Sequence, residues 1–362
     1  TTHQSLLPLP QKVVEKLGDA WVKKENYVGN GAYKLANHII NEKIEFERNP
    51  LYWNDKETVI NSATFLAIEN PSTDVARYRA GDLDMTNYAL PPEQFAKLQK
   101  ELPGEVFTTR TLATYSYELN NKKAPFDNVN IRKALNLSLD RKVITDKVLG
   151  QGQTPTYVFT PTYIEEGQLI QQPAYSKEPM AQRNEEAIKL LEEAGYSKAN
   201  PLKFSILYNT NENHKKVAIA AASMWKANTK GLIDVKLENQ EWKTYIDSRR
   251  AGRYDAARAG WNADYNQATT FGNYFLSNSS NNTAKYANPE YDKAIAESYV
   301  ATDAEGRAKA YAKAEEILAK DFGIVPIFNY VNPRLVKPYV KGYSGKDPQD
   351  HIYLRNLYII KH

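Results

Sequence analysis

The sequence predicts an α/β protein made of two lobes, and three observations carry this prediction. The middle of the chain reads as a strand at Leu202–Tyr208, a helix at Glu212–Asn228 and a second strand at Ile233–Leu237. This βαβ order implies that the sheet is at least partly parallel. The first third is instead rich in short strands and turns, and a short strand-forming tail closes the chain. At 362 residues the chain is long enough for two or three domains.

The elements of the first third follow from alternation and helical spacing. Ile44 and Phe46 alternate with charged residues, which is typical of a half-buried strand. Tyr115, Tyr117 and Leu119 alternate in the same way. The sequence predicts strands at Lys43–Arg48, Ala63–Ile68 and Ala113–Leu119, and helices at Thr73–Ala80, Pro92–Leu102 and Asn130–Leu149, the last broken near Leu139-Asp140.

The rest of the chain is more helical. Gln151–Pro179 is rich in Pro, Gly, Thr and Gln and reads as a long irregular segment, which in a compact protein is usually functional or packed over a surface. Gly195 is a suitable stop for the helix that precedes it. Besides the βαβ unit, we expect helices at Glu185–Ala194, Gln240–Arg250 and Ala304–Ala319, and strands at Tyr254–Gly260, Ile324–Tyr330 and Tyr353–Ile360.

Composition excludes several classes of protein. Hydrophobic residues make up 42% and charged residues 25%, which is ordinary for a globular chain and excludes a fibre, a disordered tail or a membrane bundle. The net charge of +4 is small and spread along the chain, so no nucleic-acid partner is indicated. Cysteine is absent, which removes disulfides and thiolate chemistry and leaves the compartment open. The 25 tyrosines, against 11 Phe and 5 Trp, favour a recognition protein.

Catalytic and cofactor motifs are missing. The sequence contains no phosphate-binding G-x-x-x-x-G-K-[ST], no G-x-S-x-G and no H-E-x-x-H. Gly29-Asn30-Gly31 lacks the third glycine of a dinucleotide fingerprint and is better explained as a turn. The pairs Asp82/Asp84 and Glu192/Glu193 could serve a glycosidase, but adjacent carboxylates are usually solvated surface. We therefore expect no enzyme activity, no cofactor and no metal.

Six strings in register resemble the periplasmic oligopeptide-binding proteins, the peptide receptors of ATP-driven oligopeptide importers. They are GNGAYKL (29–35), ERNPLYWN (47–54), DVARYRAGDLDM (74–85), PFDNVNIRKALNLSLDR (125–141), ARAGWNADYNQATTF (257–271) and VNPRLVKPYVKGYSGKDP (331–348). Each string alone is moderately specific, but together they run in the family's order over the whole chain. They favour the oligopeptide branch over the dipeptide, nickel and haem branches.

The resemblance implies a two-lobed, periplasmic-binding-protein-like type II fold with mixed sheets and a hinge. Residues 1–112 and 332–362 would form one lobe and residues 113–331 the other, with crossing segments near Ala113–Glu118 and Pro326–Val331. Roughly the first third of the family's length, including its signal peptide, has no counterpart, and the chain begins Thr-Thr-His. We expect the missing part to exist and to be needed for stable binding, because a lobe without its opening strands exposes sheet edges.

The resemblance also implies a set of peptide-binding residues. Asp264 would receive the amino terminus of the peptide, although from the residues alone a turn or helix-capping role is favoured. Arg258, Arg249 and His214 would meet its carboxylate, and Arg258 is the strongest candidate because arginine offers a planar fork. From the residues alone, Arg249 reads as a solvated cation and His214 equally well as surface. The remaining positions implied by the family are the backbone of Gly260 and Asn262, Trp261 for stacking, Tyr330 as a cleft wall, and Glu118 near the pockets or in a hinge salt bridge.

Two departures from the family pattern affect specificity. Ala113 and Asn262 stand where the pattern has a cysteine pair, so that staple is absent. Leu149 stands where a lysine can take part in binding short ligands. Losing that cation is expected to disfavour the shortest peptides or to enlarge the pocket.

These observations predict a non-catalytic solute-binding protein of the periplasm or cell surface. It would close on an extended oligopeptide, deliver it to the membrane permease of an ABC importer, and act as a monomer. Side-chain pockets would be roomy and wet, so that bridging waters rearrange for each ligand. One alternative is the same fold with another ligand, such as a murein peptide, haem or a metal complex. The other is a hydrolase that uses carboxylates such as Asp82 and Asp84.

Overall fold

The computed structural model describes residues 7–87 and 89–362, and the chain forms two compact units. Unit 1 contains residues 1–109 and 332–362, and unit 2 contains residues 110–331. Two long strands, β4 (Val106–Leu119) and β9 (Ile324–Leu335), each contain one of the boundaries. The lobes expected from the sequence, with boundaries after residues 112 and 331, stay a prediction.

Unit 1 is built from short strands and three α-helices. Its sheet has the order β1-β2-β3 and is antiparallel, with a bulge between Leu35 and Asn37. Every residue of these three strands is exposed or half-buried. The elements are α1 (Gln11–Leu17), β1 (Tyr33–Ile39), β2 (Lys43–Arg48), β3 (Ser62–Leu66), α2 (Pro71–Ala80), α3 (Pro92–Glu101), β10 (Val340–Lys341) and β11 (Tyr358–Ile359).

The buried part of unit 1 surrounds α2 and α3. The helix α2 begins at Asn70, whose side chain accepts hydrogen bonds from the N–H groups of Ser72 and Thr73. It ends at Gly81, which has the left-handed φ of 88° that glycine adopts without strain. The core cluster comprises Val75, Tyr78, Leu90, Phe95, Leu98 and Leu335.

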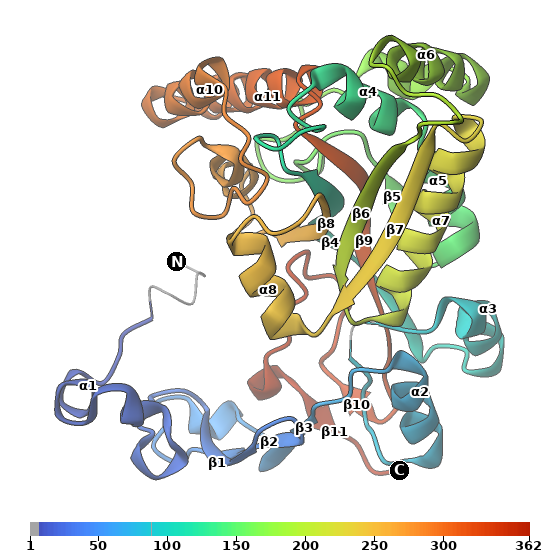
Figure 1. Cartoon of the computed structure of the whole chain (residues 1–362). Helices are drawn as coiled ribbons and strands as arrows, with labels where there is room; N and C mark the ends of the chain where they lie inside the picture. Colours follow the sequence, from blue (N-terminus) through green and yellow to red (C-terminus); the bar gives the residue numbers. More distant parts are fainter. Residues whose placement is uncertain (1–6, 88) are drawn as a thin grey trace. The chain divides into compact units, whose positions relative to one another are not determined.

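Unit 2 is an α/β structure around a mixed sheet (Figure 1). In the sheet order β5-β9-β4-β8-β6-β7, β4 and β8 are antiparallel, whereas β6 is parallel to both β7 and β8. Its strands after β4 are β5 (Thr154–Pro155), β6 (Leu202–Asn209), β7 (Ile233–Gln240), β8 (Ala256–Asn262) and β9. Its helices are α4 (Val129–Leu137), α5 (Arg141–Val143), the π-helix η5 (Ile144–Leu149), α6 (Met180–Glu193), α7 (Glu212–Asn228), α8 (Trp242–Arg250), α9 (Thr269–Gly272), α10 (Pro289–Val300) and α11 (Ala304–Lys320).

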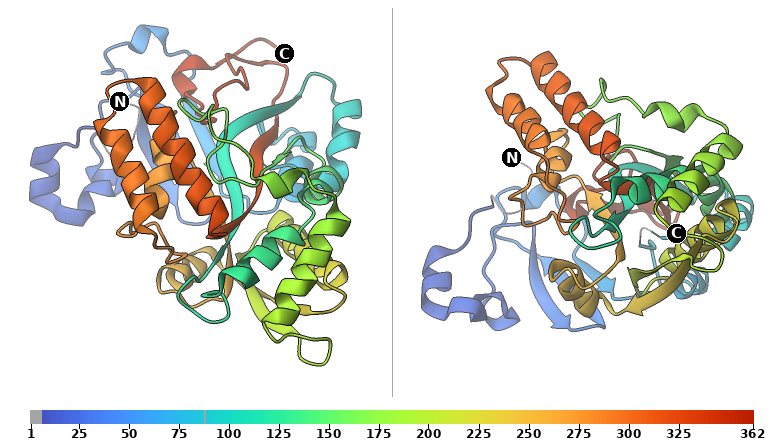
Figure 2. Two further views of the ribbon diagram at one scale, coloured as in Figure 1. Left: turned by 90° about the horizontal axis from the view of Figure 1, so that it is seen from above. Right: turned by 45° about the horizontal axis from the view of Figure 1, so that its top comes forward.

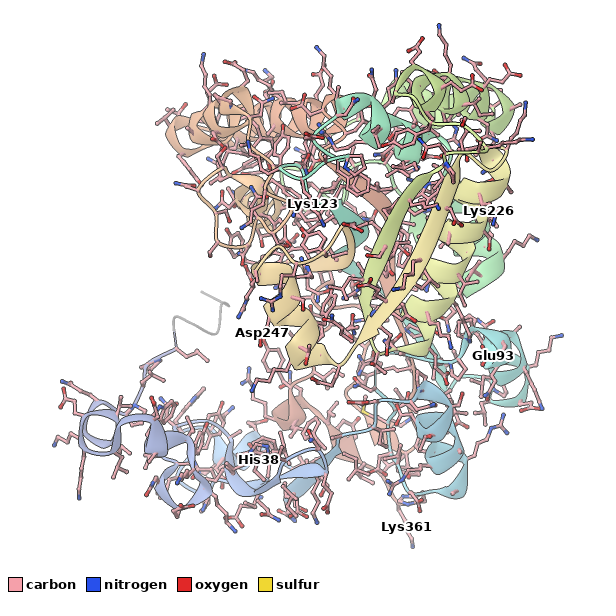
Figure 3. All side chains as sticks on the ribbon, in the orientation of Figure 1. His38, Glu93, Lys123, Lys226, Asp247 and Lys361 are labelled. Atoms are coloured by element: carbon pink, nitrogen blue, oxygen red, sulfur yellow. The ribbon has the colours of Figure 1, made fainter. Side chains whose placement is uncertain are left out.

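Helices bury both faces of this sheet. The helix α7 contacts β6 and β7, and its Trp225 packs against Tyr117 of β4 with the ring centroids 5.9 Å apart. On α8, Tyr245 is buried with Leu207 and Ala257, while Asp247 lies on the exposed side (Figure 3). The helices α10 and α11 lie side by side, and their residues share a second core cluster with Phe159 and Phe271 (Figure 2). None of the helices in the described part of the chain is long and apolar enough to cross a membrane.

Most sequence-based element predictions are confirmed. The strand β2 and the helix α7 have the predicted bounds, and β6 and β7 are parallel as the βαβ pattern requires. The predicted break near residue 139 is present, because the Asp140 side chain caps α5 by accepting from the N–H groups of Lys142 and Val143. The predicted strand Tyr353–Ile360 is wrong in most of its length: residues 354–356 form a 3-10 turn, and just two residues, β11, pair with the equally short β10. The helix α10 was not predicted, although Asn288 and Pro289 mark its start.

Candidate functional site

The strand β8 offers an edge of main-chain groups that β6 does not cover. The two strands pair at just two positions, Ala256 and Ala257 of β8, in the described part of the chain. The N–H of Ala263 donates to the carbonyl of Leu112 at 2.8 Å, so the peptide groups of Ala263 face β4. Hydrogen bonding alternates between the two edges along a strand, so the main-chain groups of Gly260 and Asn262 face away from β4. They are therefore placed to pair with an added strand.

Arg258 lies on the α7 side of this strand in an aromatic setting. Its Nη2 donates to the hydroxyl of Tyr330, and its guanidinium carbon lies 5.2 Å from the ring centroid of Tyr115. Within the described residues no carboxylate lies within ion-pair distance of Arg258, and its buried Nε–H has no partner. Burial opposes the charge, but Tyr330, Tyr245 and Tyr115 hold the pKa of this guanidinium above its ordinary value. Arg258 is thus a cation that lacks an acidic partner.

Gly260 leaves space beside this cation. A Cβ atom at residue 260 would lie 3.1 Å from the Tyr330 hydroxyl and 3.2 Å from Nη2 of Arg258. These distances are tighter than ordinary carbon contacts, so any side chain here would press on the Arg258–Tyr330 pair. Glycine therefore permits close approach of a ligand to the strand at the point where the cation is held.

His214 lies near Arg258 at the start of α7. Its ring centroid is 5.6 Å from that of Tyr115, and its main-chain N–H donates to Oδ1 of Asn211, which caps the helix. Burial, with Arg258 adding to it, lowers the pKa of His214 well below 6.5. The imidazole is therefore neutral at pH 7 and can donate one hydrogen bond to an anion without adding charge.

The lowered pKa of His214 predicts a loss of stability in mild acid. As pH falls below 6.5, the unfolded chain binds a proton that the folded protein does not, so the free energy of unfolding decreases. Replacing His214 by glutamine is expected to remove this part of the pH dependence. Denaturant unfolding of both proteins from about pH 7.5 to about pH 5 measures it. Equal pH dependence in both would contradict the prediction, and the exposed His38 (Figure 3) provides a control substitution.

Asp264 follows directly after the open edge. It is half-buried, and its N–H donates to Oγ1 of Thr270 at 3.1 Å. The same hydroxyl accepts from the indole N–H of Trp261 at 3.2 Å and lies 3.4 Å from a carboxylate oxygen of Asp264. Trp261 also packs edge to face on Tyr274, with the ring centroids 4.9 Å apart. Thr270 therefore fixes both the carboxylate and the indole at one end of the edge.

Arg249 and Glu118 form an internal ion pair. Nη2 of Arg249 lies 3.0 Å from a Glu118 oxygen, and the side chains are 10% and 1% exposed. The carboxylate also accepts from the hydroxyls of Tyr274 and Thr283. Burial alone would lower the pKa of Arg249, but Glu118 holds it well above its ordinary value. The two charges therefore neutralise each other within unit 2.

The structure thus gathers the predicted site residues into unit 2 in two groups. Arg258, His214 and Tyr330 meet around Tyr115, and Asp264 and Trp261 meet at Thr270. Arg249 and Glu118 lie apart from these as a closed pair.

The positions where the chain departs from the family pattern also lie in unit 2. Ala113 and Asn262 stand directly opposite each other in the β4–β8 ladder. Leu149 is buried in the core at the end of η5.

Two residues that contact the candidate site, Tyr245 and Thr270, are not among the predicted site residues, because their partners lie in other elements. The rival carboxylates belong to unit 1, where Asp82 is paired with Arg77 at 3.7 Å and Asp84 accepts from the Tyr339 hydroxyl at 2.9 Å. In residues 7–87 and 89–362, no three His, Asp or Glu side chains gather as they would around a metal ion.

Comparison with known proteins identifies the class. Residues 2–283 match the bacterial extracellular solute-binding proteins, family 5. The periplasmic oligopeptide-binding protein OppA of Haemophilus influenzae is 96% identical over 361 residues, which cover 100% of this chain and 67% of that protein. The crystal structure of Haemophilus influenzae OppA with the peptide RPPGFSPFR superposes with a TM-score of 0.96 at 96% identity and covers 100% of this chain and 70% of that one. The murein tripeptide-binding protein MppA of Escherichia coli has a TM-score of 0.92 at 42% identity, covering 98% of this chain and 69% of that one.

The mixed sheet and these relatives define a binding protein with the type II periplasmic-binding-protein fold, as the sequence predicted. The chain belongs to the bacterial extracellular solute-binding proteins of family 5. It spans about two thirds of the length of the curated relatives that it matches.

Proposed function

We propose that the protein captures extended oligopeptides by their main chain and their charged ends. The observation that supports this most is the uncovered edge of β8 between a cation without an acidic partner, Arg258, and a carboxylate, Asp264. A peptide added to this edge would hydrogen-bond through its main chain, which is independent of sequence. With its ammonium at Asp264 and its carboxylate at Arg258, it would run antiparallel to β8.

The two termini would be bound by different chemistry. The half-buried guanidinium of Arg258, which has no acidic partner among the described residues, would donate to the carboxylate, with neutral His214 beside it. Asp264 would accept from the ammonium, and Trp261, held by Thr270, would contact a ligand side chain. Tyr330 would hold Arg258 in place. We assign Arg249 and Glu118 a supporting role, because each already neutralises the other.

Removing the cation tests the carboxylate end. Replacing Arg258 by glutamine is expected to weaken tetra-alanine binding by about 1.5–3 kcal/mol, the value of a hydrogen bond to a charged group. Titration calorimetry with the free acid and with the C-terminal amide measures the effect. The amide should bind both proteins similarly, and the exposed Arg250 provides a control substitution. A loss of equal size for the amide would mean that Arg258 does not bind the carboxylate.

The ligand itself tests the proposal as a whole. Mass spectrometry of small molecules released on denaturation is expected to find a mixture of short peptides. A single defined molecule, such as haem or a metal complex, would support the other ligand class. Turnover of a substrate without tight binding would support a hydrolase.

The family also supports a proposed location and proposed partners. Two relatives, at 96% and 54% identity, are named periplasmic oligopeptide-binding proteins, and we propose the periplasm for this protein as well. Capture between two lobes and delivery to the permease of an ABC importer are part of the same proposal. Family relatives are solute-binding proteins, and we propose that this chain is likewise a receptor, not an enzyme. The monomeric state stays a prediction.

A further inference from the structure

One main-chain acceptor on the open edge of β8 is already occupied. Main-chain groups alternate between the two edges of a strand, and those of Ala263 face β4. The main-chain groups of residues 258, 260 and 262 therefore face away from β4, so the carbonyl of Arg258 lies on the same edge as the groups of Gly260 and Asn262. The hydroxyl of Tyr245 donates to this Arg258 carbonyl. The residues of this edge therefore divide into Gly260 and Asn262, which a ligand can use, and Arg258, which Tyr245 has capped.

The packing of α8 fixes this cap. Tyr245 is completely buried among Leu207, Tyr254 and Ala257, and Ala257 immediately precedes Arg258. Its ring lies 5.8 Å from that of Trp242, one turn earlier on α8. A tyrosine on a packed helix cannot swing away to let a ligand strand reach the same carbonyl, because its ring is enclosed on all sides.

The capped carbonyl lies at the point where β8 stops pairing with β6. The last pair between β6 and β8 joins Leu207 to Ala257, although β6 itself continues to Asn209. The next carbonyl on that edge of β8 belongs to Arg258. The Tyr245 hydroxyl thus lies between the last β6–β8 pair and the first main-chain groups of β8 that are open to a ligand. A ligand N–H that bonded to the Arg258 carbonyl would have to take the place already occupied by the Tyr245 hydroxyl.

We propose that Tyr245 is a positioning residue that ends the ligand's hydrogen-bonded ladder at Gly260. This inference rests on the proposed peptide binding along β8. With the ladder closed at residue 258, a bound peptide cannot slide further along β8 toward β6. Its register is set by Gly260 and Asn262, and its carboxylate meets the side chain of Arg258 where the ladder stops.

Ester substitution in a peptide tests this directly. A series of hexa-alanine analogues replaces one amide N–H at a time by an ester oxygen, which removes a donor to a strand carbonyl. Tyr245→Phe frees the Arg258 carbonyl with almost no change in shape. In Tyr245→Phe, one ester position that has no effect in the wild type is expected to weaken binding about three- to tenfold. This position lies two residues nearer the peptide's C-terminus than the last position at which an ester weakens binding to the wild type.

The controls distinguish a failure of the Tyr245 inference from a failure of the proposed strand addition. Tyr291 is also buried and donates to a main-chain carbonyl outside β8, that of Gly272 at 2.8 Å. Tyr291→Phe should keep the wild-type ester pattern while losing similar stability. An unchanged pattern in Tyr245→Phe, with peptide binding intact, overturns the inference. Two other results would instead overturn the proposed strand addition. One is that hexa-alanine does not bind the wild type, and the other is that the ester positions that weaken binding are not two residues apart.

A second measurement does not depend on a variant. In a crystal structure of the wild-type protein with hexa-alanine, the Tyr245 hydroxyl, and not a ligand N–H, is expected within hydrogen-bond distance of the Arg258 carbonyl. A ligand N–H bonded to that carbonyl would overturn the inference.

Discussion

Replacing Asp264 by asparagine is expected to weaken binding of a short peptide with a free amino terminus by about 2–5 kcal/mol, as when one partner of a buried charge pair is lost. The carboxylate is half-buried, and Thr270 holds the main chain beside it, so a neutral amide would occupy the same place without compensating the ligand's ammonium. Titration calorimetry with tetra-alanine measures the loss.

Two comparisons make the Asp264 result specific. N-acetyl-tetra-alanine has no ammonium, so its affinity should change little between the wild type and Asp264→Asn. Asp247, on the exposed side of α8 (Figure 3), provides the matched control, and Asp247→Asn should leave tetra-alanine binding unaltered. If Asp264→Asn binds tetra-alanine as tightly as the wild type does, Asp264 does not receive the amino terminus.

Replacing Glu118 by glutamine is expected to lower the free energy of unfolding by about 3–5 kcal/mol, the cost of leaving a buried charge without its partner. The Arg249 guanidinium donates to Glu118, Tyr274 and Thr283, and its remaining Nε–H already lacks a partner. With the carboxylate gone, the cation would stay buried among neutral groups. Urea unfolding measures the change.

The double substitution checks the mechanism. Replacing Arg249 by methionine in the Glu118→Gln background removes the uncompensated cation and should restore part of the lost stability. The exposed Glu316 offers a matched control, and Glu316→Gln should change stability by less than about 0.5 kcal/mol. A loss of similar size at Glu316, or no recovery in the double variant, would mean that the pair is not what stabilises this region.

Local patterns predicted much of the fold. The strand β2 is recognisable because Ile44 and Phe46 alternate with charged residues, and α7 because Asn211 caps a run of helix-forming residues. The prediction of a strand at Tyr353–Ile360 is wrong for a physical reason. The segment pairs with β10, which offers just two positions. A strand needs a partner, and the length of that partner is not written in the strand's own sequence.

For the candidate site as well, some features could be predicted from the sequence and others could not. The family resemblance implied which residues would bind the peptide, and in the structure Arg258, His214 and Tyr330 lie around Tyr115. The pairing of Glu118 with Arg249 joins residues 131 positions apart, and no local pattern reports such a contact. The open edge of β8 depends on where β6 stops pairing, and the cap on Arg258 depends on how α8 packs. Neither follows from the sequence of β8 alone.

The most direct test of the account compares tetra-alanine with its end-capped forms in one calorimetric series. The account predicts that acetylating the amino terminus and amidating the carboxylate each weaken binding by about 1.5 kcal/mol or more, while exchanging alanine side chains for other small neutral ones has a smaller effect. Undiminished affinity for the doubly capped peptide, together with strong dependence on the side chains, would contradict the claim that the ligand is held by its main chain and its two charged ends.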